Sequence, residues 1–145
     1  MWVANAVSMS FIAAFVIPGT LWLRGDAWHG RLLGTVVAAN MAVAGLKQIF
    51  GGAGMFGRPP AAEGCDLLCR GPRVGGQPGF PSGHMTTAAL LVSALWFHGG
   101  DRWTLLVGVS WVAAMAWARW VKSCHNWQQI VAGTVLGSAV GYLVA

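Results

Sequence analysis

The chain has 145 residues, of which 56% are hydrophobic and only 9% are charged. Soluble domains carry about 25% charged residues, so this chain lacks the polar surface that a water-soluble fold of its length needs. Its mean hydropathy of +0.59 agrees with a single membrane-embedded domain over residues 1–145. The formal net charge is +5, but the basic residues form no run. We therefore expect an anionic lipid or a phosphorylated substrate as the partner, and no nucleic acid.

Five apolar segments have the composition of transmembrane helices, which need about 20 mostly apolar residues to cross about 30 Å of hydrocarbon. They span residues 2–23, 32–50, 85–97, 103–117 and 127–144. The third and fourth are short, so flanking residues are expected to extend them. The first lacks a basic leader and a clear cleavage site, so we expect it to be retained. The sequence thus predicts an all-α integral membrane bundle of about five transmembrane helices.

Five crossings bring the N-terminus and the connections 51–81 and 120–126 to one end of the bundle, here called face A. The C-terminus and the connections 24–31 and 98–102 fall at the other end, face B. Every tryptophan except Trp111 then lies near a membrane interface, where this residue is enriched. Face A collects both His84 and His125, all three cysteines and most of the basic side chains.

The orientation of face A does not follow from its positive charge alone. A simple count of Lys and Arg places face A in the cytoplasm. Several of these cations are candidates for binding an anion, however, so we discount the count. We expect the site on the extracytoplasmic or lumenal side, and no oligomeric state follows from the sequence.

The connection of residues 51–81 is long, rich in Gly and Pro, and without periodicity. Such connections are either functional or disordered, and we expect a loop that covers a site. Cys65, Cys69 and Cys124 together with two histidines suggest zinc, but a second ligand pair at regular spacing is missing, so we expect no metal. A disulfide at face A is the expectation if that face is oxidising.

The last apolar segment carries a stripe of residues at every fourth position. Glycines at this spacing allow close packing of helices in lipid, so the stripe is expected to face protein. Its first two members would then point inward with the glycines. The stripe consists of His125, Gln129, Gly133, Gly137 and Gly141.

Residues 80–91 read FPSGHMTTAALL, with polar residues directly before an apolar run. Ser82 is a favoured helix N-cap, and Gly83 allows another group to approach the backbone. The N-terminus of a helix attracts anions, and His84 would stand beside such an anion with a proton to give. A capped helix start with an interfacial histidine is the alternative, and the cations of face A favour the anion site.

Three blocks in the order GRPP, PSGH and ARWVKSCHNWQQ resemble the signature of the type 2 phosphatidic acid phosphatase superfamily, lipid phosphate phosphatases related to vanadium haloperoxidases. The family pattern is Lys-x6-Arg-Pro, Pro-Ser-Gly-His and Ser-Arg-x5-His-x3-Asp. The second block matches in full, and the third places five residues between Arg119 and His125. The resemblance covers roughly residues 47–137.

The chain departs from this pattern at three positions. Ten residues rather than six separate Lys47 from Arg58. Ala118 stands where the family has Ser, and Gln129 stands where it has Asp. The branch that acts on dolichyl diphosphate is similar in having Gln there. Family members also usually show six crossings, whereas the hydropathy pattern here shows five.

The resemblance implies a metal-independent phosphatase that forms a phosphohistidine and needs no cofactor. His125 would be the nucleophile, His84 the general acid, and Gln129 would orient the ring of His125. Positive charge around the phosphoryl oxygens is the main demand of this chemistry. The residues expected to bind those oxygens are Lys47, Arg58, Ser82, Gly83 and Arg119.

The implied substrate is a lipid phosphate or diphosphate, such as polyprenyl diphosphate, phosphatidic acid or phosphatidylglycerol phosphate. The neutral Gln129 favours the first, because a diphosphate leaves more readily. Asp66 or Glu63 folding in from the loop is an alternative source of a carboxylate. The alternative function is a non-catalytic member that binds or moves phosphorylated lipids.

Five polar side chains have simpler expected or alternative roles. Lys47 has the alternative of snorkelling to the membrane interface, and Lys122 is expected at that interface. Arg70 and Arg73 are expected either to contact headgroups or to be solvated. Asn40, in the middle of an apolar segment, is expected to make an interhelical hydrogen bond.

Overall fold

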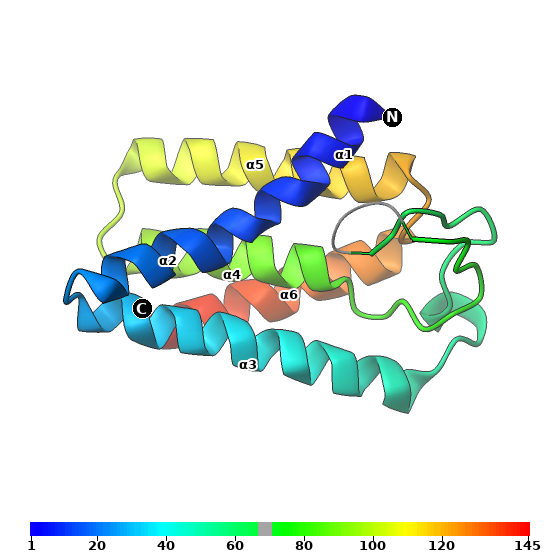
Figure 1. Cartoon of the computed structure of the whole chain (residues 1–145), viewed down its shortest axis with the longest axis horizontal. Coiled ribbons are helices and arrows are strands. Elements are labelled where there is room, and N and C mark those ends of the chain that lie inside the picture. The colour runs from blue at the N-terminus through cyan, green and yellow to red at the C-terminus, as the bar shows by residue number, and fades with distance from the viewer. Residues whose placement is uncertain (67–70) are drawn as a thin grey trace.

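The computed structural model describes residues 1–66 and 71–145, and these form a helical bundle without a β-sheet (Figure 1). Helix α1 (Trp2–Met9), a 3-10 turn (Ser10–Ile12) and α2 (Ala13–Leu23) make one long N-terminal segment. The other helices are α3 (Ala27–Phe50), α4 (Gly83–Phe97), α5 (Arg102–Val121) and α6 (Trp127–Val144). The predicted all-α bundle of five helical segments is confirmed. Cys69 and Arg70, considered above, lie outside the described residues.

Two helices begin earlier than their apolar runs because an aspartate caps them. Asp26 Oδ1 accepts the backbone N–H groups of Trp28 and His29 at 3.0 and 3.2 Å, so α3 starts at Ala27 rather than at residue 32. Asp101 Oδ1 accepts Thr104 N at 2.8 Å at the start of α5. Such caps satisfy backbone donors that the helix itself leaves unpaired. Hydropathy alone does not locate them, and the α2–α3 connection shrinks to residues 24–26.

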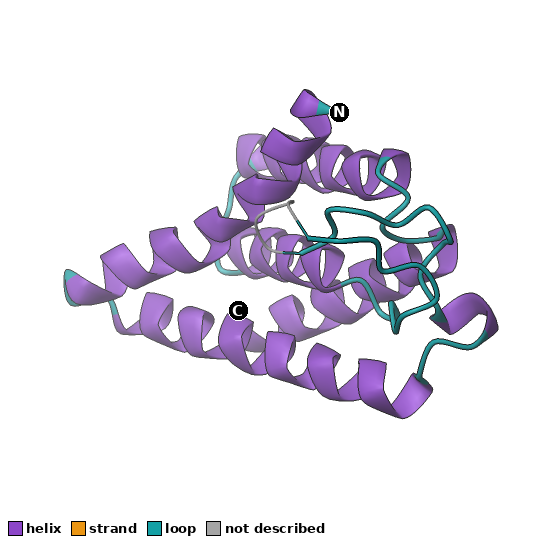
Figure 2. Cartoon of the chain, turned by 45° about the vertical axis from the view of Figure 1, so that its right-hand side comes forward, coloured by secondary structure: helices purple, strands orange, loops and turns teal. Residues whose placement is uncertain are grey.

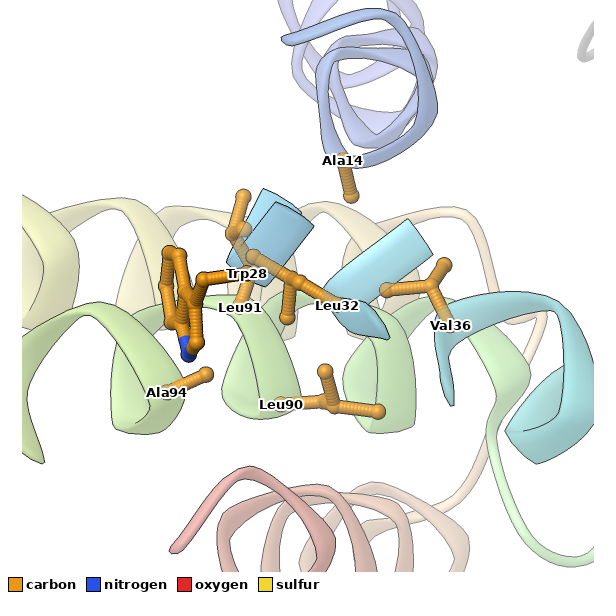
Figure 3. Packing of buried hydrophobic residues seen from close by; sticks show 7 residues of the cluster. All are labelled: Ala14, Trp28, Leu32, Val36, Leu90, Leu91 and Ala94. Atoms are coloured by element: carbon orange, nitrogen blue, oxygen red, sulfur yellow. The ribbon is translucent and has the colours of Figure 1, made fainter. Parts of the chain in front are cut away.

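Helix α4 is the centre of the bundle, and nine of its 15 residues are buried. It packs against α2, α3, α5 and α6. Close to its face B end, Leu90, Leu91 and Ala94 meet Ala14 of α2 together with apolar side chains of α3 (Figure 3). The outer helices expose large apolar residues, as expected for lipid contact. Among the described helices, three are long and apolar enough to cross a membrane: Trp2–Leu23, Ala27–Phe50 and Arg102–Val121.

The glycine stripe of α6 faces α4, as predicted. The buried residues of α6 are Gln129, Gly133, Gly137 and Gly141. A Cβ on any of the three glycines would collide with backbone oxygens along α4, namely those of Ser82, Thr86 and Leu90 in that order. The two helices therefore meet backbone to backbone, which places the start of α6 beside the start of α4.

The long loop and the α5–α6 connection gather at the same end of the bundle (Figure 2). This end also carries the N-terminus, whereas the C-terminus lies at the opposite end (Figure 1). The arrangement matches the alternation of connections that the five predicted segments require. Residues 51–66 and 71–81 and residues 122–126 are thus the segments from which a site at face A can be built.

Candidate active site

A cavity of about 190 Å³ lies at the face A end and is lined by residues of five segments, half of them with polar or basic side chains. Both His84 and His125 open into it. The lining residues are Phe11, Asn40, Val43, Ala44, Lys47, Arg58, Cys65, Gly83, His84 and His125. A larger hollow of about 460 Å³ between α4, α5 and α6 carries no titratable side chain, and the smaller cavity, with two histidines, is the candidate site.

His125 lies in the turn between α5 and α6, directly before the helix in which the stripe continues. Its Nδ1 is 2.9 Å from Oε1 of Gln129. The Nε2 group of Gln129 donates to the carbonyl oxygens of Met55 and Gly57 at 3.0 and 2.7 Å, which fixes the direction of the amide. Because Oε1 can only accept, Nδ1 of His125 must carry the proton. The Nε2 atom of the neutral ring is therefore left with a free lone pair.

Burial is the main cause that lowers the pKa of His125 well below its ordinary value of 6.5. The positive charges of Arg58 and Arg119 lower the pKa further, whereas the hydrogen bond to Gln129 opposes the shift. Desolvation disfavours the charged imidazolium, and neighbouring cations repel it. His125 is consequently a neutral base with an available nitrogen.

The turn that carries His125 is shaped by its neighbours. Asn126 caps α6 by accepting Gln129 N at 3.0 Å, and its own amide donates to Met55 O at 3.0 Å. Ser123 adopts a left-handed backbone with φ of 53°, which reverses the chain after α5. The loop and the turn are thus tied together on both sides of His125.

His84 occupies the first turn of α4, and its ring lies 4.3 Å from that of Phe11 between centroids. Ser82 holds the N-cap position as predicted, but its hydroxyl makes no capping bond. Within the described part of the chain, Ser82 Oγ and His84 Nε2 are buried and have no hydrogen-bond partner. Buried polar atoms are rarely left unpaired, so these two atoms at a helix N-terminus mark a place for a ligand.

Lys47 and Arg58 line the same cavity despite the ten residues between them. A short 3-10 turn, Gly54–Phe56, folds the intervening chain back after α3. The Nζ atom of Lys47 lies 4.0 Å from where a Cβ on Gly83 would stand, so the missing side chain leaves room beside the start of α4. The unusual spacing therefore does not separate the two cations.

Arg119 and Lys122, at the end of α5, are both buried. Nη2 of Arg119 donates to Cys65 O at 3.3 Å. Three of the predicted site residues do not line the cavity, namely Arg119, Ser82 and Gln129. Lys122, expected at the membrane interface, lies at the face A end, where its Nζ donates to Gly64 O at 2.7 Å. The sequence missed this contact since the acceptor lies in an aperiodic loop.

A disulfide joins Cys65 to Cys124, so two of the three cysteines considered as zinc ligands are bonded to each other. The loop carboxylates do not serve His125, whose partner is Gln129. Glu63 instead pairs with Arg73 at 3.5 Å on the surface, and Asp66 is exposed. Arg73 is thus exposed on the loop.

Several positions near the site gave little or no sequence signal. Phe11 covers His84 from the N-terminal segment, and Cys65 was considered only for a disulfide or zinc. A Cβ on Gly79 would come within 2.8 Å of Gln129 Oε1, so this glycine lets the loop reach the amide. Asn40 makes the predicted interhelical bond, to Thr87 Oγ1 at 2.9 Å, but its place in the cavity wall was not foreseen.

A family model described as the PAP2 superfamily matches residues 28–145. No curated protein and no solved structure matched the chain. The matched region contains every residue of the cavity wall except Phe11.

Proposed function

Because the chain belongs to the PAP2 superfamily, which includes phosphatases, we propose that it is an integral membrane enzyme that hydrolyses a lipid phosphate or diphosphate through a phosphohistidine. One observation carries this proposal: a neutral His125, held at Nδ1 by Gln129, shares a cationic cavity with His84. This arrangement supplies a nucleophile, an acid and anion-binding groups in a single place.

The proposed reaction has two steps. In the first, His125 Nε2 attacks phosphorus, a P–N bond forms, the P–O bond to the leaving group breaks, and His84 gives its proton to the departing oxygen. In the second, water attacks the phosphohistidine, the P–N bond breaks, and His84 takes the proton from the water. Inorganic phosphate leaves, and both histidines return to their starting states.

The cations and the start of α4 would stabilise the charge on the phosphoryl oxygens. Lys47 and Arg58 line the cavity, and the first backbone amides of a helix have no partners within it. Ser82 Oγ, Gly83 N and the charge of Arg119 are assigned to the same anion. Such fixed positive groups supply most of the stabilisation in phosphoryl transfer.

The neutral partner of His125 favours a substrate with a good leaving group. Gln129 orients the ring but adds no negative charge, so the positive charge that His125 acquires on attack is less stabilised than beside an aspartate. Departure of a phosphate from a diphosphate needs less help than departure of an alkoxide. A polyprenyl diphosphate is therefore the first candidate, ahead of phosphatidic acid and phosphatidylglycerol phosphate.

Two features support a lipid substrate and the location. Phe11, Val43 and Ala44 give the cavity an apolar wall in a bundle that exposes large apolar side chains. The Cys65–Cys124 disulfide suits an oxidising compartment. We therefore assign the site to the extracytoplasmic or lumenal side of the membrane.

The decisive experiment measures phosphate release from a panel of lipid phosphates and diphosphates by the purified protein, with and without chelator. We expect His125→Ala to abolish release, His84→Ala to lower it by about 10²–10⁴-fold, and chelator to have no effect. His29→Ala, at the opposite end of the bundle, is the matched control. Release at the parent rate by the His84→Ala/His125→Ala protein would refute the proposal.

Binding or movement of phosphorylated lipids without hydrolysis is the second candidate, motivated by the neutral Gln129. Labelled substrate separates the two functions, because only the enzyme acquires an acid-labile phosphate on His125. A protein that binds the lipid at this cavity and never becomes labelled is a binder.

A further inference from the structure

Two cysteines beside the candidate site are joined by a disulfide that bridges 59 positions of sequence. Cys65 lies in the long loop and lines the cavity, whereas Cys124 directly precedes His125. The bond therefore joins the loop to the turn that carries the proposed nucleophile.

The backbone oxygens of the same two cysteines accept hydrogen bonds from the two site arginines. Arg58, on the loop, donates from Nη1 to Cys124 O at 3.0 Å. Arg119, on α5, donates from Nη2 to Cys65 O at 3.3 Å. Each guanidinium thus reaches across to the cysteine of the opposite segment, so the direction of each arginine depends on how the two segments are joined.

Apart from the disulfide, a small apolar cluster and a set of polar hydrogen bonds join the two segments. The apolar cluster around the bond consists of Ala62, Cys65 and Cys124, with Val74 packed on its edge, and it is separate from the two larger clusters between the helices. The other direct links are polar, such as the bond from Lys122 Nζ to Gly64 O. The disulfide thus lies outside the apolar clusters of the bundle and is the covalent link between the loop and the turn that carries His125.

We propose that the Cys65–Cys124 disulfide is a positioning element for Arg58 and Arg119, and that anion binding in the cavity depends on its oxidation. Reduction by a dithiol breaks the S–S bond, forms two protein thiols and leaves the reductant as a cyclic disulfide. The two carbonyl acceptors then separate, and the guanidinium groups lose the geometry in which they face the anion. The proposal rests on the proposed function for the identity of the anion, a phosphoryl group.

The test uses the full chain in detergent, with inorganic phosphate as the probe. The dissociation constant for phosphate is measured for oxidised, dithiothreitol-reduced and reoxidised protein, and for Cys65→Ser/Cys124→Ser, at a temperature well below unfolding. Helical circular dichroism and hydrolysis of a lipid diphosphate are followed in parallel. Cys69→Ser, which keeps the disulfide, is the matched control.

We expect reduction and the double substitution to weaken phosphate binding about tenfold, the usual effect of one lost hydrogen bond to a charged group. Reoxidation should restore binding in the parent and in Cys69→Ser but not in the double variant. The helical signal should stay constant, because the apolar clusters between the helices do not contain the disulfide. A purely structural bond would instead change thermal unfolding without changing phosphate affinity.

Three results overturn the proposal. The first is phosphate affinity within about twofold across all forms. The second is no phosphate binding by the oxidised protein. The third is loss of helical structure on reduction, because the bundle itself would then need the bond. Redox-dependent phosphate binding without hydrolysis of any lipid phosphate instead supports the positioning role and removes only the proposed enzymatic function.

Discussion

The seam between α4 and α6 and the loop of residues 51–81 both hold Gln129, but they do so by different forces. Along the seam, glycines bring the backbones of two helices into direct contact. From the loop, the carbonyl groups of Met55 and Gly57 accept the Gln129 amide. Close packing thus determines where the residue stands, and hydrogen bonds determine which way its amide points. The predictions below separate these contributions, beginning with the largest expected effect.

Disrupting the seam between α4 and α6 should cause the largest loss of stability. In Gly137→Val, the added methyl groups would collide with Thr86 O, and overpacking of this kind costs about 1–3 kcal/mol. Gly45→Val is the control, because no atom lies within 4 Å of a Cβ at that position. Denaturant unfolding in detergent measures both. Equal losses of stability in the two variants would contradict the assigned role of the seam.

Removing the hydrogen bonds between the loop and the Gln129 amide should lower the reaction rate more than the stability of the fold. Gln129→Leu leaves Nδ1 of His125 without an acceptor and leaves the buried carbonyl group of Gly57 unpaired, whereas Met55 O keeps the amide of Asn126. An unmade buried hydrogen bond costs about 1–3 kcal/mol, so we expect kcat/KM to fall about 10–100-fold. The neighbouring Gln128→Leu, for which no such bond exists in the described structure, should retain the parent rate. Similar rates for both variants would exclude orientation of the ring by Gln129.

The loop also sets the pH dependence through Arg58. Under the proposed function, His125 attacks only when unprotonated, and its pKa lies well below 6.5 because of burial and the nearby arginines. The rate should therefore persist as the pH falls through 6.5 and decline only at lower pH. Arg58→Gln removes one positive charge, which raises the pKa of His125 and moves the acidic limb of kcat/KM upward. Arg73→Gln should leave this acidic limb unchanged. An equal upward shift in Arg73→Gln would show that the pKa of His125 responds to the net charge of the loop and not to Arg58 in particular.

The smallest effect is expected at the exposed edge of the loop. Arg73 and Glu63 form an ion pair whose side chains are 83% and 64% exposed. Exposed pairs contribute less than about 1 kcal/mol and are screened by salt. Arg73→Ala should therefore leave turnover unchanged and barely alter unfolding. A larger loss that persists at high salt would show that this edge supports the site.

The same contrast explains which parts of the molecule could be predicted from sequence. The stripe from Gln129 to Gly141 repeats every four residues, and this periodicity predicted its buried face correctly. Hydropathy located five helical segments but not the starts that Asp26 and Asp101 cap. The loop has no periodicity, so the contacts that join it to the end of α5 and to the following turn could not be foreseen. These contacts are the hydrogen bonds of Lys122, Arg119 and Arg58. Phe11 gave no signal, because one apolar residue in an apolar segment is like any other.

The short central helix has a consequence for the depth of the chemistry. With 15 residues, α4 rises about 22 Å, whereas the 20 residues of α5 rise about 30 Å. The first turn of α4, which carries His84, is recessed relative to the ends of α3 and α5 (Figure 1). Under the proposed function, a phosphate must descend from the headgroup level into a polar well to meet the histidines. An extra turn inserted into α4 directly after His84 would raise His84 by about 5 Å toward the headgroup level, so the length of α4 sets the depth at which the proposed reaction occurs.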